Sequence, residues 1–274
     1  MDVDRSLSDV GEGDEVRFEE FGKDKEKVFV LVHPSLVMWD YYEFLIPYME
    51  DSYHLIIPVL DGYDKKNRND FTSVEEIAEK IEDYLLKQGI HEISGIYGCS
   101  MGGSVVLRFL ADRKIRVHGA VIDGGITPYQ LPWILTRCIA IRDFLMIYMG
   151  KLGGLKLLQK AFSTDEYSKE DLEYIADVLN FVSAKTIWRT FESCNNYAMP
   201  KEVQIDCERI EYWYAQMEKK DRKWDIDYVK KKVPQTVFRE FENIGHGGLA
   251  LLKPDLLAKE LKRMTGEEDE RLQS

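Results

Sequence analysis

A short glycine-rich segment between a strand-like and a helix-like segment places the strongest constraint on the fold. Residues 98–103 read Gly-Cys-Ser-Met-Gly-Gly and fit the pattern Gly-x-Ser-x-Gly. An apolar, strand-like run at residues 93–97 precedes them, and a helix-like run at residues 104–111 follows. Small residues around Ser100 let the backbone turn sharply, which predicts a hydroxyl exposed above the carboxyl end of a parallel sheet. The alternative interpretation is a glycine-rich turn that only lets helix and strand pack closely.

Strand-like and helix-like segments alternate through much of the chain. A predicted helix follows the N-cap candidates Thr72 and Ser73 and ends at Gly89, and another begins near Pro254 and stops at Gly266. Runs rich in β-branched and aromatic residues predict strands at residues 15–21, 27–32, 54–60, 93–97, 117–122, 209–215 and 236–241. This alternation predicts an α/β fold with a mostly parallel central sheet and helices on both faces.

The alternation stops after Gly125. Residues 126–205 have helical periodicity and no convincing strand, which predicts a helical cap inserted into the core domain. The predicted organisation is therefore residues 1–125 as the first part of the core, 126–205 as the cap and 206–274 as the second part. Several aromatic side chains of the cap are expected either to line an apolar pocket or to form the cap's own core: Tyr129, Trp133, Phe144, Tyr148, Phe162, Trp188 and Phe191.

Charge and cysteine usage narrow the class of protein. The formal net charge of −12 argues against a nucleic-acid binder and disfavours docking on anionic membranes. The first residues have neither the basic nor the apolar part of a secretory signal, and no apolar run is long enough to span a bilayer. The four cysteines are scattered, and Cys and His lack metal-ligand spacing. We expect a cytoplasmic protein with free thiols and no metal.

A serine nucleophile needs a base and an acid that orients the base. His246 lies in a glycine-flanked loop after the predicted strand 236–241, at the same sheet edge as Ser100. Glu218, the first carboxylate after the predicted strand 209–215, is the preferred acid. Asp221 is the second choice and Asp123 the third; each carboxylate has the alternative interpretation of a solvated surface charge.

Backbone donors for a tetrahedral oxyanion are expected from two loops. The first is Met101, directly after the nucleophile. The second is Ser35, because Pro34 has no N–H, and Leu36 is the next choice. We expect Cys99 to be buried and structural. His54, His91 and His118 are expected to have structural roles. His33 is expected to have either a plain structural role or a supporting role in the oxyanion loop.

These motifs together make the chain resemble the α/β-hydrolase superfamily over residues 15–265. Residues 98–103 resemble the Gly-x-Ser-x-Gly-Gly turn of its serine-dependent members, and residues 245–247 resemble their late Gly-His loop. The sequence departs from the family where glycine and aspartate of the acid segment are replaced, leaving Glu218 as the acid, and where His33-Pro34 stands for His-Gly. The resemblance implies a Ser–acid–His triad, no cofactor and a helical lid.

The predicted function is hydrolysis of a carboxylic ester, thioester, lactone or amide through an acyl-serine intermediate, as in carboxylesterases. The expected substrate is a small acyl compound with apolar or aromatic character. Two alternatives stay open: a non-catalytic binding or interaction protein on the same scaffold, and an acyltransferase or lyase of the same superfamily. The physiological substrate and the oligomeric state are not predicted from the sequence.

Overall fold

The computed structural model describes residues 16–129, 131–161 and 168–267, so that Phe162 lies outside the described residues. The strands are β1 (Arg17–Phe21), β2 (Val28–Val32), β3 (His54–Val59), β4 (Glu92–Cys99), β5 (Arg116–Asp123), β6 (Cys207–Ala215) and β7 (Val237–Phe241). The helices are η1 (Trp39–Tyr42), α1 (Ile46–Met49), α2 (Val74–Lys87), α3 (Met101–Asp112), α4 (Trp133–Ala161), α5 (Lys169–Phe181), α6 (Ala184–Asn196), η2 (Gln216–Glu218), α7 (Lys223–Lys232), α8 (Gly248–Leu252) and α9 (Pro254–Met264).

The described strands form one seven-stranded sheet in the order β1-β3-β2-β4-β5-β6-β7. Only β1 runs antiparallel to its neighbour, and the other strands pair in parallel. The predicted α/β fold with a mostly parallel sheet is therefore confirmed. After β2 the chain adds β3 on one side of it and then crosses over to add β4 on its other side, so the strand order switches direction between the neighbours β2 and β4. Ligands of open α/β sheets bind in the crevice outside such a switch point.

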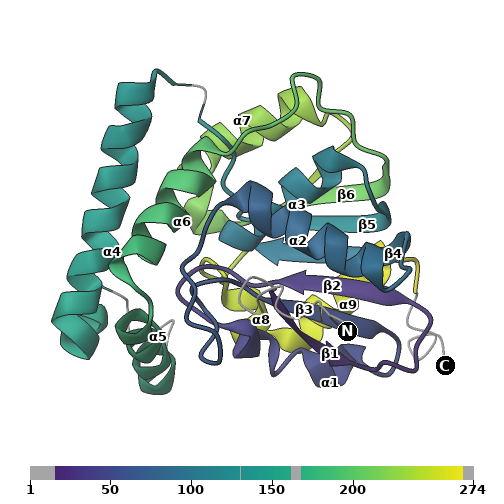
Figure 1. Ribbon diagram of the computed structural model, residues 1–274, viewed down its shortest axis with the longest axis horizontal. Helices are drawn as coiled ribbons and strands as arrows, with labels where there is room; N and C mark the ends of the chain where they lie inside the picture. Colours follow the sequence, from purple (N-terminus) through teal and green to yellow (C-terminus); the bar gives the residue numbers. More distant parts are fainter. Residues whose placement is uncertain (1–15, 130, 162–167, 268–274) are drawn as a thin grey trace, which may run out of the picture.

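Alternation along the strands divides the core between the two faces of the sheet. In β2, Val28, Val30 and Val32 belong to the cluster that α2 and α3 cover, whereas Phe29 and Leu31 belong to the opposite cluster. The opposite cluster also contains residues of α1, α8 and α9. Figure 1 shows α2 and α3 in front of the sheet and α8 and α9 behind it. Because both faces of β2 are buried, apolar residues occupy every position of the strand instead of alternating with polar ones.

Helices α4, α5 and α6 occupy the segment predicted as the cap. Figure 1 shows them at the end of the molecule toward which the parallel strands point, next to the carboxyl ends of the sheet. The cap has a small apolar cluster of its own, which includes Leu158 of α4 and Leu172 of α5. Gly154 has φ +57° and interrupts the helical conformation of α4, so that the helix consists of two segments joined at a kink.

Candidate active site

The turn between β4 and α3 holds Ser100 in an unusual backbone conformation. Ser100 has φ +52° and ψ −115°, a combination that non-glycine residues rarely adopt. Its N–H donates to the carbonyl oxygen of Asp123 at 2.8 Å, which ties the turn to the end of β5. A Cβ atom at Gly98 would lie 2.2 Å from the carbonyl oxygen of Gly102, so this crossing requires glycine. The strand–turn–helix unit predicted from the Gly-x-Ser-x-Gly pattern is present.

Residues 33–38, the segment predicted to supply an oxyanion donor and called the oxyanion loop for that reason, lie next to this turn because β2 and β4 are paired with Val32 opposite Gly98. A Cβ atom at Gly102 would lie 2.1 Å from the carbonyl oxygen of Val32, so glycine lets the first turn of α3 approach the loop closely. Met101 is the first residue of α3, where backbone N–H groups have no partner within the helix. Ser35 lies half-buried in the facing loop.

His33 and Leu36 shape the oxyanion loop. The His33 ring is fully buried, and its Nδ1 donates to the carbonyl oxygen of Pro34 at 2.8 Å. Burial lowers the pKa of His33 to about 4, so the ring is neutral near pH 7. Leu36 has φ +68° and packs against the apolar cluster of the cap. The cap therefore contacts the loop at a backbone position that L-residues adopt only at a cost.

Tyr174 of α5 links the cap to the same loop by hydrogen bonds. Its hydroxyl accepts from the backbone N–H of Met38 at 2.9 Å and donates to the carboxylate of Asp40. Sequence patterns did not identify this contact, because Tyr174 lies 134 residues from Asp40 in an ordinary amphipathic helix. The structure thus makes the position of the oxyanion loop depend on how the cap is docked.

The histidine loop, residues 243–247, follows β7 and packs against Cys99, the residue before Ser100. Gly247 has φ +69°, its carbonyl oxygen accepts from the Tyr41 hydroxyl, and a Cβ atom there would lie 3.5 Å from the Sγ of Cys99. Cys99 itself is buried, as expected. The loop that carries His246 is therefore packed beside the residue that precedes Ser100.

His246 and Glu218 are paired at this edge of the sheet. His246 Nδ1 lies 2.7 Å from Glu218 Oε1, and the two side chains are 39% and 14% exposed. Gly124 makes room for the ring, because a Cβ atom there would lie 2.9 Å from the His246 Cε1. The need for this glycine was not recognised in the sequence, although the Gly-Gly pair directly after β5 is a visible signal.

Burial and two charged neighbours, His246 and Arg222, set the ionisation of Glu218. Burial raises its pKa, but the hydrogen bond and charge of His246 and the charge of Arg222 outweigh burial and leave the pKa below its ordinary value. Arg222 also pairs with Asp225 at 3.2 Å, and Asp225 accepts from the backbone N–H of Thr127 at 2.7 Å. Glu218 is therefore an ionised carboxylate near pH 7, held on η2 by the start of α7.

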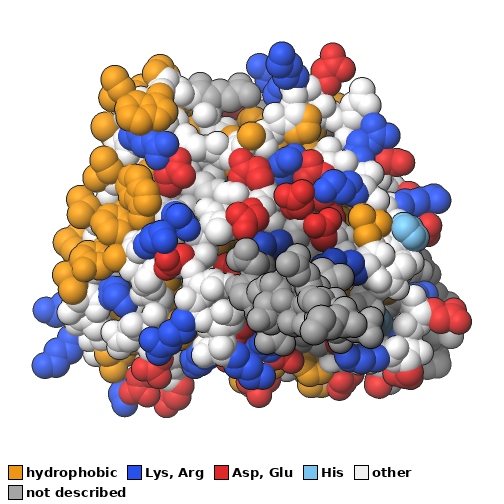
Figure 2. Space-filling model, viewed as in Figure 1, with side chains coloured by type: hydrophobic (Ala, Val, Ile, Leu, Met, Phe, Trp, Pro, Cys, Tyr) orange, Lys and Arg blue, Asp and Glu red, His pale blue; other side chains and the backbone are white. Residues whose placement is uncertain are grey.

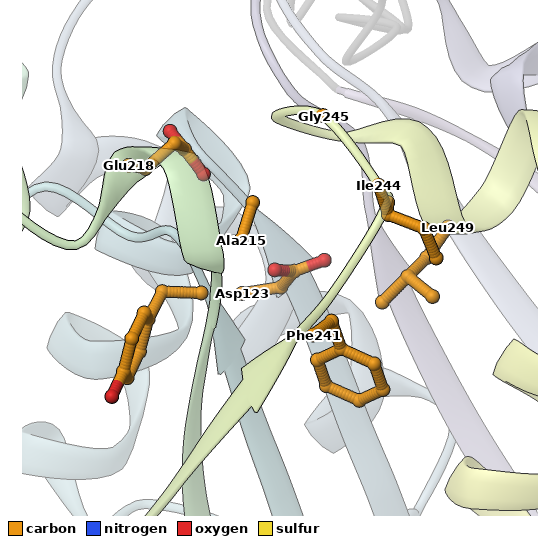
Figure 3. Close-up of a pocket in the computed structure, with 8 residues that line it drawn as sticks. Asp123, Ala215, Glu218, Phe241, Ile244, Gly245 and Leu249 are labelled. Carbon is orange, nitrogen blue, oxygen red and sulfur yellow. The ribbon is translucent and has the colours of Figure 1, made fainter.

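The other two candidate acids lie in different surroundings. Asp123 is buried at the end of β5, where its Oδ2 accepts from the Tyr97 hydroxyl at 2.6 Å. Figure 3 shows Asp123 and Glu218 lining the same small cavity, together with Ala215 of β6 and Gly245 of the histidine loop. Asp221 is exposed on the turn before α7. The structure pairs Glu218, rather than Asp221, with the histidine.

The remaining histidines and cap aromatics have other surroundings. His54 pairs with Glu20 at 2.6 Å, and His118 contacts Glu92 and Glu208 at the opposite end of β5 from Ser100. In the cap, Phe144 stacks on Tyr148 and meets Trp188 edge-on, so these three rings contribute to the cap's own packing. Trp133 is 68% exposed, so it neither lines an apolar pocket nor belongs to the core of the cap.

A buried carboxyl group with a raised pKa makes stability depend on pH. Burial raises the pKa of Asp123 to about 6, against the lowering effect of the Tyr97 hydrogen bond and the His246 charge. Between pH ~4, where aspartate ionises in the unfolded chain, and pH ~6, only the native state keeps the proton, so the free energy of unfolding falls as pH rises. Asp123→Asn keeps an acceptor for Tyr97 and removes this fall. We expect the variant to gain up to about 2 kcal/mol over wild type between pH 4 and 7.

Urea unfolding at both pH values measures this difference, and Asp221→Asn is the matched control on an exposed carboxylate. A stability difference between Asp123→Asn and wild type that does not change with pH would show that Asp123 ionises as freely in the native state as in the unfolded chain.

Among the residues described, no cluster of three or more His, Cys, Asp or Glu side chains is arranged to hold a metal ion. Within the same ranges, no helix combines the length and the hydropathy that a membrane span requires. All four cysteines are free thiols.

Comparisons with known proteins agree on the fold. The sequence model described as the alpha/beta hydrolase family matches residues 29–260. The structure is similar to that of a carboxylesterase of the Thaumarchaeon Nitrososphaera gargenis, with 18% identity, a TM-score of 0.72 and coverage of 92% of this chain and 95% of the other. An esterase from Thermogutta terrifontis has 16% identity, a TM-score of 0.70 and coverage of 90% and 92%.

A bromoperoxidase from Bacillus anthracis is as similar in fold, with 15% identity, a TM-score of 0.72 and coverage of 92% of this chain and 95% of the other. No curated protein sequence matches the chain. Since the structural relatives share so few identical residues, their likeness concerns the fold, and their activities differ from one another.

Proposed function

The chain belongs to the alpha/beta hydrolase family, and from this premise we propose that it is a serine hydrolase that cleaves a carboxylic ester, thioester, lactone or amide. The observation that carries the proposal is the 2.7 Å pair between His246 Nδ1 and Glu218 Oε1. The loop that carries His246 is packed beside Cys99, the residue before the sharply turned Ser100. A histidine that donates its Nδ1 proton to a carboxylate has Nε2 as its basic atom, which is the arrangement that activates a serine hydroxyl.

The proposed reaction has two stages. His246 takes the proton of the Ser100 hydroxyl as its oxygen attacks the acyl carbon, and then gives that proton to the leaving group, so that an acyl-serine forms. A water molecule, deprotonated by the same imidazole, then releases the acid and restores the hydroxyl. The backbone N–H groups of Met101 and Ser35 are the proposed donors to the oxyanion in both stages. Glu218 keeps its negative charge and stabilises the imidazolium.

Several features support hydrolysis over the alternatives of binding alone, acyl transfer or lyase chemistry. The family is named for hydrolases, and two of the proteins similar in fold are named as esterases. Of the three candidate acids, Glu218 is the one that pairs with His246, and His246 lowers its pKa, as a triad acid requires. Product analysis with an added alcohol acceptor separates hydrolysis from acyl transfer, because only the transferase makes the new ester.

Covalent labelling tests the proposal without knowledge of the substrate. A fluorophosphonate probe phosphonylates an activated serine hydroxyl and expels fluoride. We expect the probe to label the native protein at Ser100, identified by peptide mass spectrometry, and to leave the urea-unfolded protein unlabelled. Labelling at another serine, or none in the native protein, would favour the binding-protein alternative.

A further inference from the structure

The outer face of α4 is apolar and exposed. Of the fifteen large hydrophobic side chains that are exposed among the described residues, nine lie on this one helix. They are Trp133, Ile134, Leu135, Ile141, Leu145, Met146, Met149, Leu152 and Leu157. Figure 2 shows hydrophobic side chains gathered along the edge of the molecule that α4 forms in Figure 1. Exposed apolar patches of this extent mark sites of interaction in proteins that otherwise keep such groups buried.

The exposed positions have helical spacing, so they form a continuous stripe. Ile134, Ile141, Leu145, Met149 and Leu152 follow at intervals of three, four or seven residues, all on the side of α4 that faces away from the rest of the cap. The first helical segment, up to the kink at Gly154, extends for about 30 Å at 1.5 Å per residue. The surface is therefore long and convex, and it offers no enclosed pocket for a small ligand.

The charge of α4 indicates what covers the stripe. The helix carries five basic residues and one acidic residue, in a chain whose formal net charge is −12. Arg142, Lys156 and Lys160 are exposed, and the acidic residue, Asp143, is paired with Arg142 at 2.7 Å. Arg137 is paired with Glu192 of α6 at 2.7 Å, so the basic residues of α4 still outnumber their acidic partners. Because charges farther away than about 10 Å are screened at physiological salt, the local excess of positive charge outweighs the acidity of the whole chain.

We propose that α4 docks this enzyme on the surface of an anionic phospholipid membrane, with its axis in the plane of the interface and its apolar stripe among the acyl chains. An interfacial helix combines an apolar face with flanking Lys and Arg, and it places Trp at the boundary, as Trp133 does at the start of α4.

A second copy of the chain is a poorer occupant. A symmetric interface brings identical patches together, so the basic residues of both copies would face one another. The proposal refines, for this surface alone, the expectation that net charge keeps the protein from membranes.

Vesicle flotation tests the docking and does not depend on the proposed catalysis. We expect the full chain to float with phosphatidylcholine vesicles that contain phosphatidylglycerol, and to bind pure phosphatidylcholine less. The triple variant Ile141→Gln/Leu145→Gln/Met149→Gln should lose at least tenfold in bound fraction. Its matched control is Phe44→Gln/Val237→Gln/Leu252→Gln, in which three side chains of similar exposure lie outside α4 and binding should stay as in wild type. Lys156→Gln/Lys160→Gln should remove most of the preference for anionic vesicles.

Three outcomes overturn the proposal. The first is that the protein floats with neither kind of vesicle. The second is that the α4 variant and its control lose the same share of bound protein. The third is that binding depends neither on the lipid charge nor on Lys156 and Lys160. Analytical ultracentrifugation tests the alternative that a second copy of the chain covers the stripe. If wild type is a dimer, the α4 variant is a monomer and neither binds vesicles, the stripe is a dimer interface. Far-UV circular dichroism of each variant identifies loss of fold, and a variant that fails it is replaced by Leu145→Gln alone.

Discussion

Replacement of Ser100 by alanine lowers the turnover of a p-nitrophenyl ester by a factor on the order of 10³ or more, if Ser100 is the nucleophile. The magnitude follows from the loss of the whole acyl-enzyme route, which leaves only binding and the oxyanion donors to act on the ester. Alanine keeps the volume of the turn nearly unchanged, so the effect is chemical. The initial rate of p-nitrophenolate release with a short-chain ester measures it.

The control for this substitution is Ser52→Ala, in the turn between α1 and β3, which removes a hydroxyl far from the histidine loop along the chain. We expect its turnover to equal that of wild type. Ser100→Ala activity within tenfold of wild type would reject the proposed nucleophile. Thermal unfolding of both variants shows whether any loss comes from the fold.

Substitution of Glu218 by glutamine is expected to lower turnover by a factor on the order of 10³–10⁴. The amide is nearly the same size but carries no charge, so it neither stabilises the imidazolium nor requires the proton of His246 to stay on Nδ1. Since Glu218 Oε1 lies 2.7 Å from that nitrogen, the loss acts directly on the proposed base. The Michaelis constant should change little, because the carboxylate contacts the histidine rather than the substrate.

Asp123→Asn and Asp221→Asn serve as comparisons for Glu218→Gln. Asp221 is exposed, and its substitution should leave turnover unchanged. Asp123 is buried and lines the same cavity as Glu218, but its carboxyl group accepts from Tyr97, and we expect a loss of less than about tenfold. A larger loss for Asp123→Asn than for Glu218→Gln would transfer the role of the acid to Asp123.

The core of the fold was predictable because its signals are local. The apolar run at residues 27–32 is buried on both faces as β2, and the run at 54–60 forms β3 beside it. The glycines at 98 and 102 marked the sharp turn, since a side chain at either position would overlap backbone atoms. Alternation of strands and helices left few arrangements other than a mostly parallel sheet.

The choice among the three candidate acids was not predictable in the same way. Glu218 and Asp221 lie three residues apart in one polar segment, and neither the composition nor the spacing of that segment distinguishes them as the acid. The short helix η2 and the start of α7 turn Glu218 toward the histidine loop and leave Asp221 in solvent. That difference depends on the packing of Arg222 between Glu218 and Asp225, which no local pattern describes.

The cap shows the same limit. Its helical content was evident from periodicity, yet α4 is apolar on nearly every side, so periodicity alone did not tell its buried face from its exposed face. Packing against α5 and α6 buries one side and leaves the stripe with Trp133 in solvent. The contact of Tyr174 with Met38 and Asp40 likewise exists only once the cap is docked.

The sequence by itself determined the order of the strands, the helices α2, α3 and α9, the sharp turn at Ser100 and the candidate histidine, because backbone sterics and the alternation of apolar residues act between near neighbours. Only the tertiary structure decided which carboxylate meets His246, how the cap touches the oxyanion loop and which face of α4 stays exposed. Those features depend on contacts between residues many positions apart, whose energies are set by the packing of whole elements.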